Sequence, residues 1–312
     1  MLTRRAFMLS GAALSAVTLS GYSIAVEPNR GPLVIRYEVS PPDWRPIDGV
    51  LRIGIVADLH ACDPFMSRPR IEEIVATANE LRPDIFVLLG DFVEGLNPFF
   101  ARPLPMDDWT APLADLHAPL GTWSILGNHD FWHGDVNVVK RAMDARRLPL
   151  MENDAELIAL PGGGGFWLGG LGDQLADKAT KTGVDDLDGL TARIPNDGRP
   201  AILLAHEPDI FPRVPDRYGL TLSGHTHGGQ IRLPLLGRFP VASHYGQRYA
   251  YGHIHEGNRH LIISAGLGCS GLPIRFGVPP ELVVVDVGTP QALAARATAT
   301  MPEDTIGTAT MI

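Results

Sequence analysis

The stretch LRIGIVADLH, Leu51–His60, decides the fold. Its first seven residues are mostly apolar and rich in β-branched side chains, which predicts a short buried strand that ends at Asp58. The run DIFVLL, Asp84–Leu89, has the same character and ends before Asp91. Between the two runs, apolar residues at helical spacing predict a helix over Pro69–Leu81. The order strand, helix, strand is the repeating unit of a parallel sheet.

The rest of the chain continues this alternation and predicts an α/β fold with a largely parallel sheet. Further strands are expected at Leu33–Val39, Gly121–Leu126, Leu157–Leu160, Phe166–Leu171, Ala201–Ala205, Tyr218–Leu222, Arg248–Tyr251, His260–Ser264 and Glu281–Val287, and helices at Val136–Arg147 and Asp185–Arg193. The glycine run 162–165 is followed by neither Lys-Ser/Thr nor a helix, so we expect a hairpin turn rather than a phosphate loop. The proline-rich residues 95–120 are expected to be irregular, as a lid or rim.

Metal-ligand side chains follow five of the predicted strands. They are Asp58 with His60, Asp91, Asn128, His206, and His225 with His227. In sheets of this kind ligands bind at the carboxyl ends of the strands. A single Asp-x-His occurs by chance, but five strand ends in order, all offering oxygen or imidazole ligands, form a specific pattern that predicts a metal centre.

The composition describes an acidic chain of 312 residues with 45% apolar residues and a formal net charge of −9. This length suits one large catalytic domain. The charge argues against a protein that coats nucleic acid, because such proteins carry a basic face. Metal ions are the obvious source of the positive charge that an acidic protein needs to bind an anion.

The strand-end pattern resembles that of the calcineurin-like metallophosphoesterases: D-x-H, G-D-x-x-D/E, G-N-H-D/E, H and G-H-x-H. Every block is present, with Glu94 at a position where Asp is usual. A finer likeness is to an exported bacterial branch, through GHTHGGQ at Gly224–Gln230 and the tail motifs Gly266–Gly268, Pro273–Arg275 and Pro279–Glu281. The resemblance covers residues 50–287. It implies a sandwich of mixed β-sheets flanked by helices, in the order α/β/β/α.

The family pattern also implies two divalent metal ions. Its first ion would be held by Asp58, His60, Asp91 and His227. The second would be held by Asp91, Asn128, His206 and His225, so that Asp91 bridges the pair. The alternation of an extended chain supports this assignment, because His225 and His227 are two residues apart and lie on one face. Imidazole and carboxylate ligands without thiolate suit manganese, iron or zinc.

The implied chemistry is hydrolysis of a phosphoester by a hydroxide held between the two ions. His129 would protonate the leaving group as general acid, oriented by a carboxylate, and either Asp58 or Asp130 could serve. The expected substrate is a phosphodiester or pyrophosphate of the cell envelope, or one that is linked to a lipid. The alternatives are a broad phosphodiesterase or phosphatase for soluble nucleotides, and a membrane enzyme like UDP-2,3-diacylglucosamine pyrophosphatase. A non-enzymatic scaffold is disfavoured because every ligand and His129 are present.

The first 26 residues read as a twin-arginine signal peptide or a membrane anchor. Thr3–Met8 (TRRAFM) resembles the twin-arginine signature, and Ala6–Val26 carries no charge. Ser23-Ile24-Ala25 offers a cleavage site, but 21 uncharged residues could also span a bilayer. We therefore expect export by the twin-arginine machinery to the periplasm or envelope, with metal loaded beforehand. Residues 27–49 are expected to be a lead-in, 50–287 the catalytic domain and 288–312 a frayed tail.

Several residues stay open at this level. His133 is expected either to touch substrate or to lie on the surface, and Arg275 either to hold a second phosphate or to pair with an acid. Cys62 and Cys269 either pair or remain free, and free is favoured. The second His-x-His, His253 and His255, is expected in a solvated hairpin.

Overall fold

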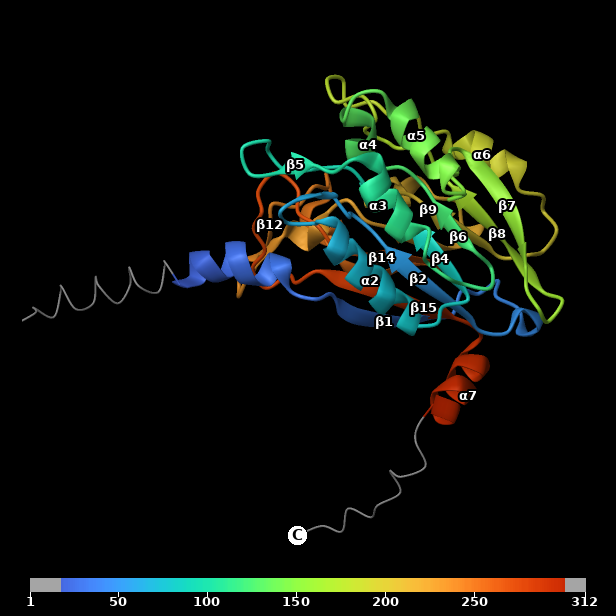
Figure 1. Cartoon of the computed structure of the whole chain (residues 1–312). Helices are drawn as coiled ribbons and strands as arrows, with labels where there is room; N and C mark the ends of the chain where they lie inside the picture. The colour runs from blue at the N-terminus through green and yellow to red at the C-terminus, as the bar shows by residue number, and fades with distance from the viewer. Residues whose placement is uncertain (1–17, 301–312) are drawn as a thin grey trace, which may run out of the picture.

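Two β-sheets stack face to face in the computed structural model, which describes residues 18–300 (Figure 1). The five-stranded sheet has the order β1 (Leu33–Val39), β15 (Glu281–Val287), β2 (Leu51–Val56), β4 (Ile85–Leu88) and β6 (Thr122–Ser124). The six-stranded sheet has the order β13 (Gly252–Glu256), β14 (Arg259–Ile263), β10 (Tyr218–Ser223), β9 (Ala201–Leu204), β8 (Gly165–Gly170) and β7 (Asp154–Ala159).

Both sheets are mixed, with parallel pairs at their centres. β2, β4 and β6 run parallel in the first sheet, and β9 pairs in parallel with β8 and β10 in the second. The antiparallel pairs are β15 with β2, β13 with β14, and β7 with β8. The parallel centres aim the carboxyl ends of neighbouring strands at one edge of each sheet.

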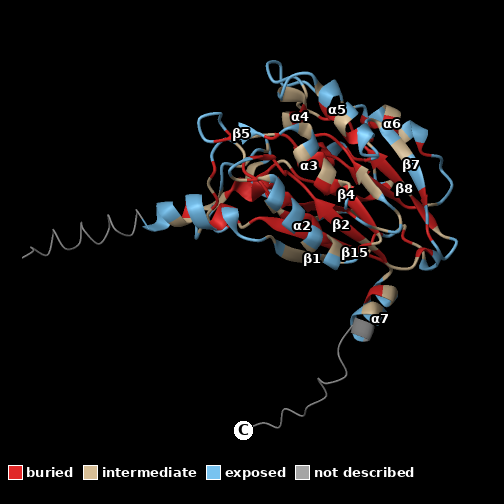
Figure 2. Ribbon diagram, in the orientation of Figure 1, coloured by how far each residue is buried: buried red, intermediate tan, exposed pale blue. Residues whose placement is uncertain are grey.

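Side-chain alternation along the strands creates three apolar layers. In β4, Ile85 and Val87 point into the space between the sheets, while Phe86 and Leu88 point toward the helices. The helices on that side are α2 (Arg68–Glu80), α3 (Met106–Leu113) and α5 (Val136–Ala145). The outer face of the six-stranded sheet packs against α6 (Leu187–Arg193) and the 3-10 helix Pro208–Arg213. The buried residues of Figure 2 follow these layers, so the architecture is the α/β/β/α sandwich.

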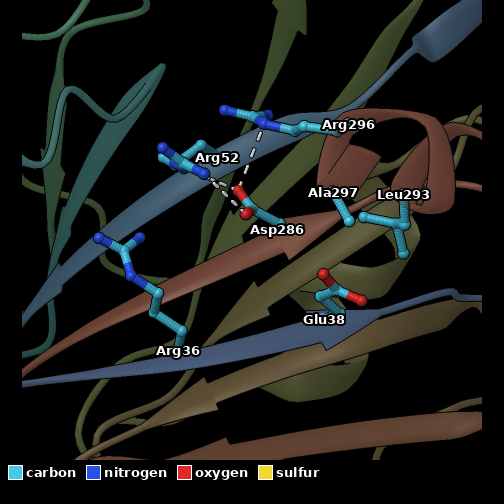
Figure 3. Close-up of a pocket in the computed structure, with 7 residues that line it drawn as sticks. All are labelled: Arg36, Glu38, Arg52, Asp286, Leu293, Arg296 and Ala297. Carbon is cyan, nitrogen blue, oxygen red and sulfur yellow. Dashed lines mark hydrogen bonds and ion pairs between the residues drawn. The ribbon is translucent and has the colours of Figure 1, made fainter. Parts of the chain in front are cut away.

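Helix α7 (Pro290–Thr300) occupies part of the segment expected to be a frayed tail. Alanine-rich sequence favours a helix, Pro290 fits its first position, and Leu293 is buried. Asp286 of β15 pairs with Arg52 of β2 at 2.8 Å and with Arg296 of α7 at 3.7 Å (Figure 3). These ion pairs connect α7 to the sheet. Residues 301–312 lie outside the described part of the chain.

Two other predicted segments differ from the structure. The segment 95–120 contains the short strand β5 (Arg102–Pro103), paired with β3 (Cys62–Asp63), and helix α3, whose Trp109 is buried. The strand predicted at Arg248–Tyr251 is instead the 3-10 helix Gly246–Tyr249. In this conformation the ring of Tyr249 is buried against that of Phe211, with ring centroids 6.0 Å apart. A further hairpin joins β11 (Ile231–Leu233) to β12 (Gly237–Phe239). The short helix α4 (Asn128–Trp132) follows β6.

The segment expected to be a lead-in is part of the sandwich. β1 coincides with its predicted range and forms an edge of the five-stranded sheet. Just before it, the carbonyl of Ser23 accepts a hydrogen bond from the amide of Arg275 at 2.9 Å, and the buried carboxylate of Glu27 accepts one from the amide of Val278 at 2.7 Å. These contacts lie at and beside the predicted cleavage site. The catalytic domain therefore extends upstream of residue 50.

The twin-arginine pattern Thr3–Met8 lies outside the described residues. Within residues 18–300, no helix is both long enough and apolar enough to cross a bilayer.

We predict that Glu27→Ala destabilises the protein, because the buried amide of Val278 loses its acceptor. The free energy of unfolding should fall by about 1–3 kcal/mol, the usual result of leaving a buried donor unpaired. Urea denaturation measures the change. Glu38→Ala, at an exposed glutamate of β1, is the control and should leave the midpoint unchanged. Equal stability of the two variants would show that the Glu27 contact does not hold the N-terminal segment.

Candidate metal centre

The predicted ligands meet at the edge where the carboxyl ends of both sheets lie. Asp58 follows β2, Asp91 follows β4 and Asn128 follows β6, all in the five-stranded sheet. His206 follows β9 and His225 follows β10 in the six-stranded sheet. The centre is therefore built from both layers of the sandwich.

The first group of ligands is Asp58, His60, Asp91 and His227, and all four are buried. The Nε2 atoms of His60 and His227 are 2.9 Å apart. The carboxylate Oδ2 of Asp91 lies 3.5 Å from Nε2 of His60, and Oδ1 of Asp58 lies 3.7 Å from Nε2 of His227. These four side chains are the set predicted for the first ion.

The second group shares Asp91. Its Oδ2 lies 3.3 Å from Nε2 of His206, so the same oxygen faces histidines of both groups. His225 belongs to this second group, and its Nδ1 lies 2.8 Å from Oδ1 of Asn128. The structure thus brings together all seven predicted ligands, and Asp91 belongs to both groups.

Backbone carbonyls orient two of the histidines toward the centre. Nδ1 of His60 lies 3.1 Å from the carbonyl oxygen of Val93, and Nδ1 of His206 lies 2.6 Å from that of Leu89. A proton on Nδ1 satisfies each carbonyl and leaves the Nε2 lone pair for a metal. Burial lowers the pKa of His60 to about 3, which keeps its imidazole in the neutral form that ligates.

Two buried atoms at the centre lack hydrogen-bond partners among the described residues: Oδ2 of Asp58 and Nε2 of His206. An unpaired buried polar atom costs about 1–3 kcal/mol. Two divalent cations, one in each ligand group, would satisfy these atoms and would compensate the buried carboxylate of Asp91. The donor set of imidazole, carboxylate and amide oxygen therefore fits two divalent ions.

The backbone is left-handed at five of the seven ligands, which is uncommon outside glycine. The φ angles are 52° at Asp58, 48° at His60, 55° at Asp91, 68° at His225 and 51° at His227. Such conformations cost energy and persist where the surrounding structure enforces them, as at functional sites. Space is tight as well. A Cβ at Gly127 would come within 2.4 Å of Oδ1 of Asp91.

A family model described as calcineurin-like phosphoesterase matches residues 51–257. The chain belongs to the calcineurin-like phosphoesterase family. It is therefore a metal-dependent phosphoric ester hydrolase, and the ligand groups described above are its candidate dimetal centre.

Two relatives match this phosphoesterase over most of their length. YkuE of Bacillus subtilis (strain 168), an uncharacterized metallophosphoesterase, is 31% identical over 91% of this chain and 96% of its own. Phosphodiesterase YaeI of Escherichia coli (strain K12) is 29% identical over 92% of this chain and 100% of its own. Among solved structures, TT1561 of Thermus thermophilus matches with a TM-score of 0.45 and 14% identity, covering 70% of this chain and 90% of that one.

His129 lies beside the ligands of the phosphoesterase but in neither ligand group. Its ring stands edge-on to His60 at 4.8 Å, and its Nε2 lies 3.3 Å from the hydroxyl of Ser270. Its backbone amide donates to Oδ1 of Asp91 at 2.8 Å. His129 and Ser270 both line a cavity of about 210 Å³ that opens over the ligands. The imidazole thus lies at the wall of the cavity, next to the candidate ligands.

Neither carboxylate proposed to orient His129 contacts its ring. Asp130 accepts hydrogen bonds from four backbone amides at 2.9–3.1 Å, those of Asp91, Phe92, Val93 and Gly127. Oδ1 of Asp58 accepts the amide of His225 at 2.8 Å. The ring of His129 instead contacts the hydroxyl of Ser270. Asp130 therefore holds together the loops that carry Asp91 and Asn128 through hydrogen bonds to their backbone amides.

The residues left open by the sequence also find their places. Arg275 is buried, donates to the carbonyls of Gly268 and Ala265, and lies 3.4 Å from Nδ1 of His227. It lines neither cavity at the site, and within residues 18–300 it forms no ion pair with an acid. His133 is exposed and lines neither of the two cavities at the site. Cys62 and Cys269 are free and buried.

The second His-x-His lies in the hairpin of β13 and β14, as expected. His253 contacts His260 at 2.9 Å, and His255 stacks on His260 at 4.2 Å between ring centroids. The three histidines therefore contact one another on the six-stranded sheet.

Two features of the site were missed by the sequence reasoning. Asp173 and Glu207 are buried behind His206 and form a third candidate ligand group with it. Burial, followed by the adjacent Glu207, raises the pKa of Asp173 to about 10. The signal was present, because Gly172-Asp173 follows a predicted strand just as Gly90-Asp91 does. The contact between Ser270 and His129 gave no local signal, since the two residues are distant in the chain.

We predict that Asp130→Ala lowers both stability and metal content. Removing the carboxylate leaves several buried amides unpaired, so the free energy of unfolding should fall by about 3 kcal/mol or more. Chemical denaturation and elemental analysis measure the two effects. Asp130→Asn keeps one acceptor oxygen and should fall between wild type and Asp130→Ala. A variant with normal stability and metal content but no activity would instead place Asp130 in the chemistry.

Proposed function

We propose that this phosphoesterase hydrolyses phosphodiester or pyrophosphate bonds with two divalent ions, manganese, iron or zinc, and with His129 as general acid. The observation that carries the proposal is the convergence of seven ligands beside an imidazole that is in neither ligand group. When bound, the two ions would supply a hydroxide nucleophile and offset the charge of the phosphate.

His129 is placed to move a proton at the leaving oxygen. Nε2 is the ring atom that meets Ser270 at the cavity, so a proton on Nε2 would point at a substrate held over the ligands. Ser270 is itself fixed, because its amide donates to Oε1 of Gln230 at 2.6 Å. His129 therefore has a defined position relative to Asp91, because the backbone amide of His129 donates to Oδ1 of Asp91.

Room for two substituents on phosphorus supports the choice of a diester or pyrophosphate. The cavity of about 210 Å³ over the ligands is continued by a second cavity of about 970 Å³, and the two share Trp132, His225 and Ala242. One substituent can leave beside His129 while the other extends into the larger cavity. A phosphomonoester would leave the larger cavity without a ligand.

Trp132 forms the wall between the two cavities. Its Nε1 donates to the carbonyl of Leu175 at 2.8 Å, which fixes the indole. Lys181 lies over the ring at 4.3 Å and Lys178 at 5.1 Å from its centroid. Arg213 and Lys181 line the larger cavity. Asp185, Glu207 and Asp209 line the same cavity, and Arg213 lies 3.6 Å from Asp185. The larger cavity therefore offers polar groups of both charges to the second substituent.

We further propose that the enzyme acts in the periplasm or cell envelope on a lipid-linked substrate, after export by the twin-arginine machinery. The twin-arginine signature at Thr3–Met8 and the uncharged run Ala6–Val26 support this location. The route carries folded proteins, so the metal centre could be filled before export. Phosphodiesterase YaeI, matched along its full length, is a relative named for diester chemistry.

The direct experiment compares bis-p-nitrophenyl phosphate with p-nitrophenyl phosphate, using manganese-loaded protein of known metal content. We expect a higher kcat/KM for the diester. A preference for the monoester would favour the broad phosphatase alternative. Protein that binds two metal ions per chain yet hydrolyses neither compound would contradict the proposed activity. Lipid-linked and nucleotide phosphates, assayed next, separate the substrate classes.

We predict that His129→Ala loses activity while keeping both metal ions. General acid catalysis is typically worth about 10²–10⁴-fold, so kcat on the diester should fall by this factor. The matched control is His133→Ala, which removes an exposed histidine from the same short segment and should retain activity. If metal content falls in step with activity, His129 acts as a ligand and its assigned role is wrong.

A further inference from the structure

Three surface loops beside the metal centre carry exposed apolar side chains. Phe99 and Phe100 lie in the loop before β5, Leu235 and Leu236 form the tip between β11 and β12, and Leu272 lies in the loop before Arg275. Phe99 is 87% exposed and Leu235 is fully exposed. We call these five side chains the apolar rim. Scattered single apolar residues are ordinary on a surface, but a contiguous group marks an interaction site.

Backbone contacts connect the three loops. The amide of Asn97 donates to the carbonyl of Gly271 at 3.2 Å, which places the phenylalanine loop beside that of Leu272. The amide of Arg232 donates to the carbonyl of Phe276 at 2.7 Å, which places the β11–β12 hairpin on the other side of the same loop. Figure 1 shows β5, β12 and the N-terminal helical segment at one end of the molecule.

The rim borders the mouth of the catalytic cavity. Ser270, two residues before Leu272, lines that cavity and contacts His129. Gln230, at the base of the hairpin, also lines it and binds the backbone of Ser270. Whatever covers the rim therefore lies next to the metal centre.

The charge around the rim is opposite to that of the protein as a whole. The formal net charge of the chain is −9, yet residues 95–106, 217–255 and 257–280 contain no Asp or Glu. Arg102 and Arg232 are exposed next to the phenylalanine loop and the hairpin. Asp63 of β3 is aligned with Arg102, but the three segments named above carry arginine and no Asp or Glu. Apolar tips flanked by these arginines are complementary to a bilayer surface that contains anionic lipids.

The N-terminal segment reaches the same place. Tyr22 packs edge-on against Phe276 with ring centroids 6.4 Å apart, and Leu19 and Ile24 line an apolar pocket with Ile231 and Ile274. The uncharged run Ala6–Val26 therefore joins the folded domain beside the rim. A run that associates with lipid would bring the rim to the lipid surface.

We propose that the apolar rim inserts into the interface of an anionic phospholipid bilayer and holds the catalytic cavity against it. This docking deepens the proposed function, because a phosphate at the headgroup level would enter the cavity without leaving the membrane. The lipid is identified by chemistry alone: an apolar interior to receive the tips, and an anionic surface to face the arginines.

The test places a polarity-sensitive maleimide dye at position 235 in the full chain, through Leu235→Cys. The two native cysteines are buried, and burial raises the pKa of Cys62 to about 11, so the introduced thiol is the one that reacts. Leu157→Cys is the control, because Leu157 is an exposed leucine on β7, at the other end of the molecule (Figure 1). The probe is a vesicle of phosphatidylcholine and phosphatidylglycerol.

We expect the dye at position 235 to shift to the blue and brighten several-fold with vesicles, less so at high salt, while the dye at position 157 stays unchanged. Adding Leu236→Asp and Phe99→Asp should abolish the shift. Full chain that binds vesicles while the dye at position 235 still reports water would overturn the proposal. So would full chain that does not bind, or a shift without vesicles that grows with protein concentration, which would mean self-association.

Hydrolysis of soluble bis-p-nitrophenyl phosphate is measured on the same labelled proteins. The rim residues lie outside the ligand and cavity residues, so this activity should match that of the unlabelled chain. A dye result and a hydrolysis result can each fail alone. Failure of membrane docking is thus separated from failure of the proposed chemistry.

Discussion

The buried carboxylate of Asp91 is the interaction on which the site depends. One of its oxygens faces His60 from the five-stranded sheet and His206 from the six-stranded sheet. The other oxygen holds the amide of His129. A buried charge is costly unless it is paired, and two divalent ions are the partners that this donor set fits. Asp91 therefore links the two layers of the sandwich, together with Asp58, which accepts the amide of His225.

That arrangement requires a backbone that most sequences avoid. Left-handed residues at the ligands, the close approach at Gly127 and the four amides bound by Asp130 act together. Hydrogen bonds within the protein hold the loops that carry the ligands, independently of any ion. Preorganisation of this kind reduces the reorganisation needed when substrate charge arrives. The strained backbone at the ligands lowers the stability of the fold, and burial of side chains in the three apolar layers offsets this cost.

The sequence predicted most of the elements and the convergence of the seven candidate ligands, because both depend on local pattern. β1 and β15 have their predicted ranges, since apolar β-branched runs bounded by turns leave little freedom. The seven ligands follow strand ends, and the parallel centre of each sheet brings strand ends together. Recognition of the family pattern then assigned them to two groups, and the distances agree with those groups.

What the sequence could not supply are contacts that depend on tertiary placement. The bond between Glu27 and Val278 joins residues 251 positions apart. The sequence suggested Asp58 or Asp130 as the carboxylate that orients His129. In the structure the oxygens of Asp130 accept hydrogen bonds from neighbouring backbone amides, and the ring of His129 contacts Ser270. The alanine-rich residues near the C-terminus resemble a frayed tail in sequence, whereas in the structure they form α7, whose Leu293 is buried.

The pairing of β1 with β15 has a consequence for synthesis of the chain. Leu33 is aligned with Glu281, and Val39 with Val287, so the first strand of the sandwich pairs with its last strand. β15 also separates β1 from β2, and the five-stranded sheet cannot close until β15 has emerged. Folding of this sheet is therefore completed only after β15 has been synthesised, and until then β1 and β2 lack the strand that separates and pairs with both.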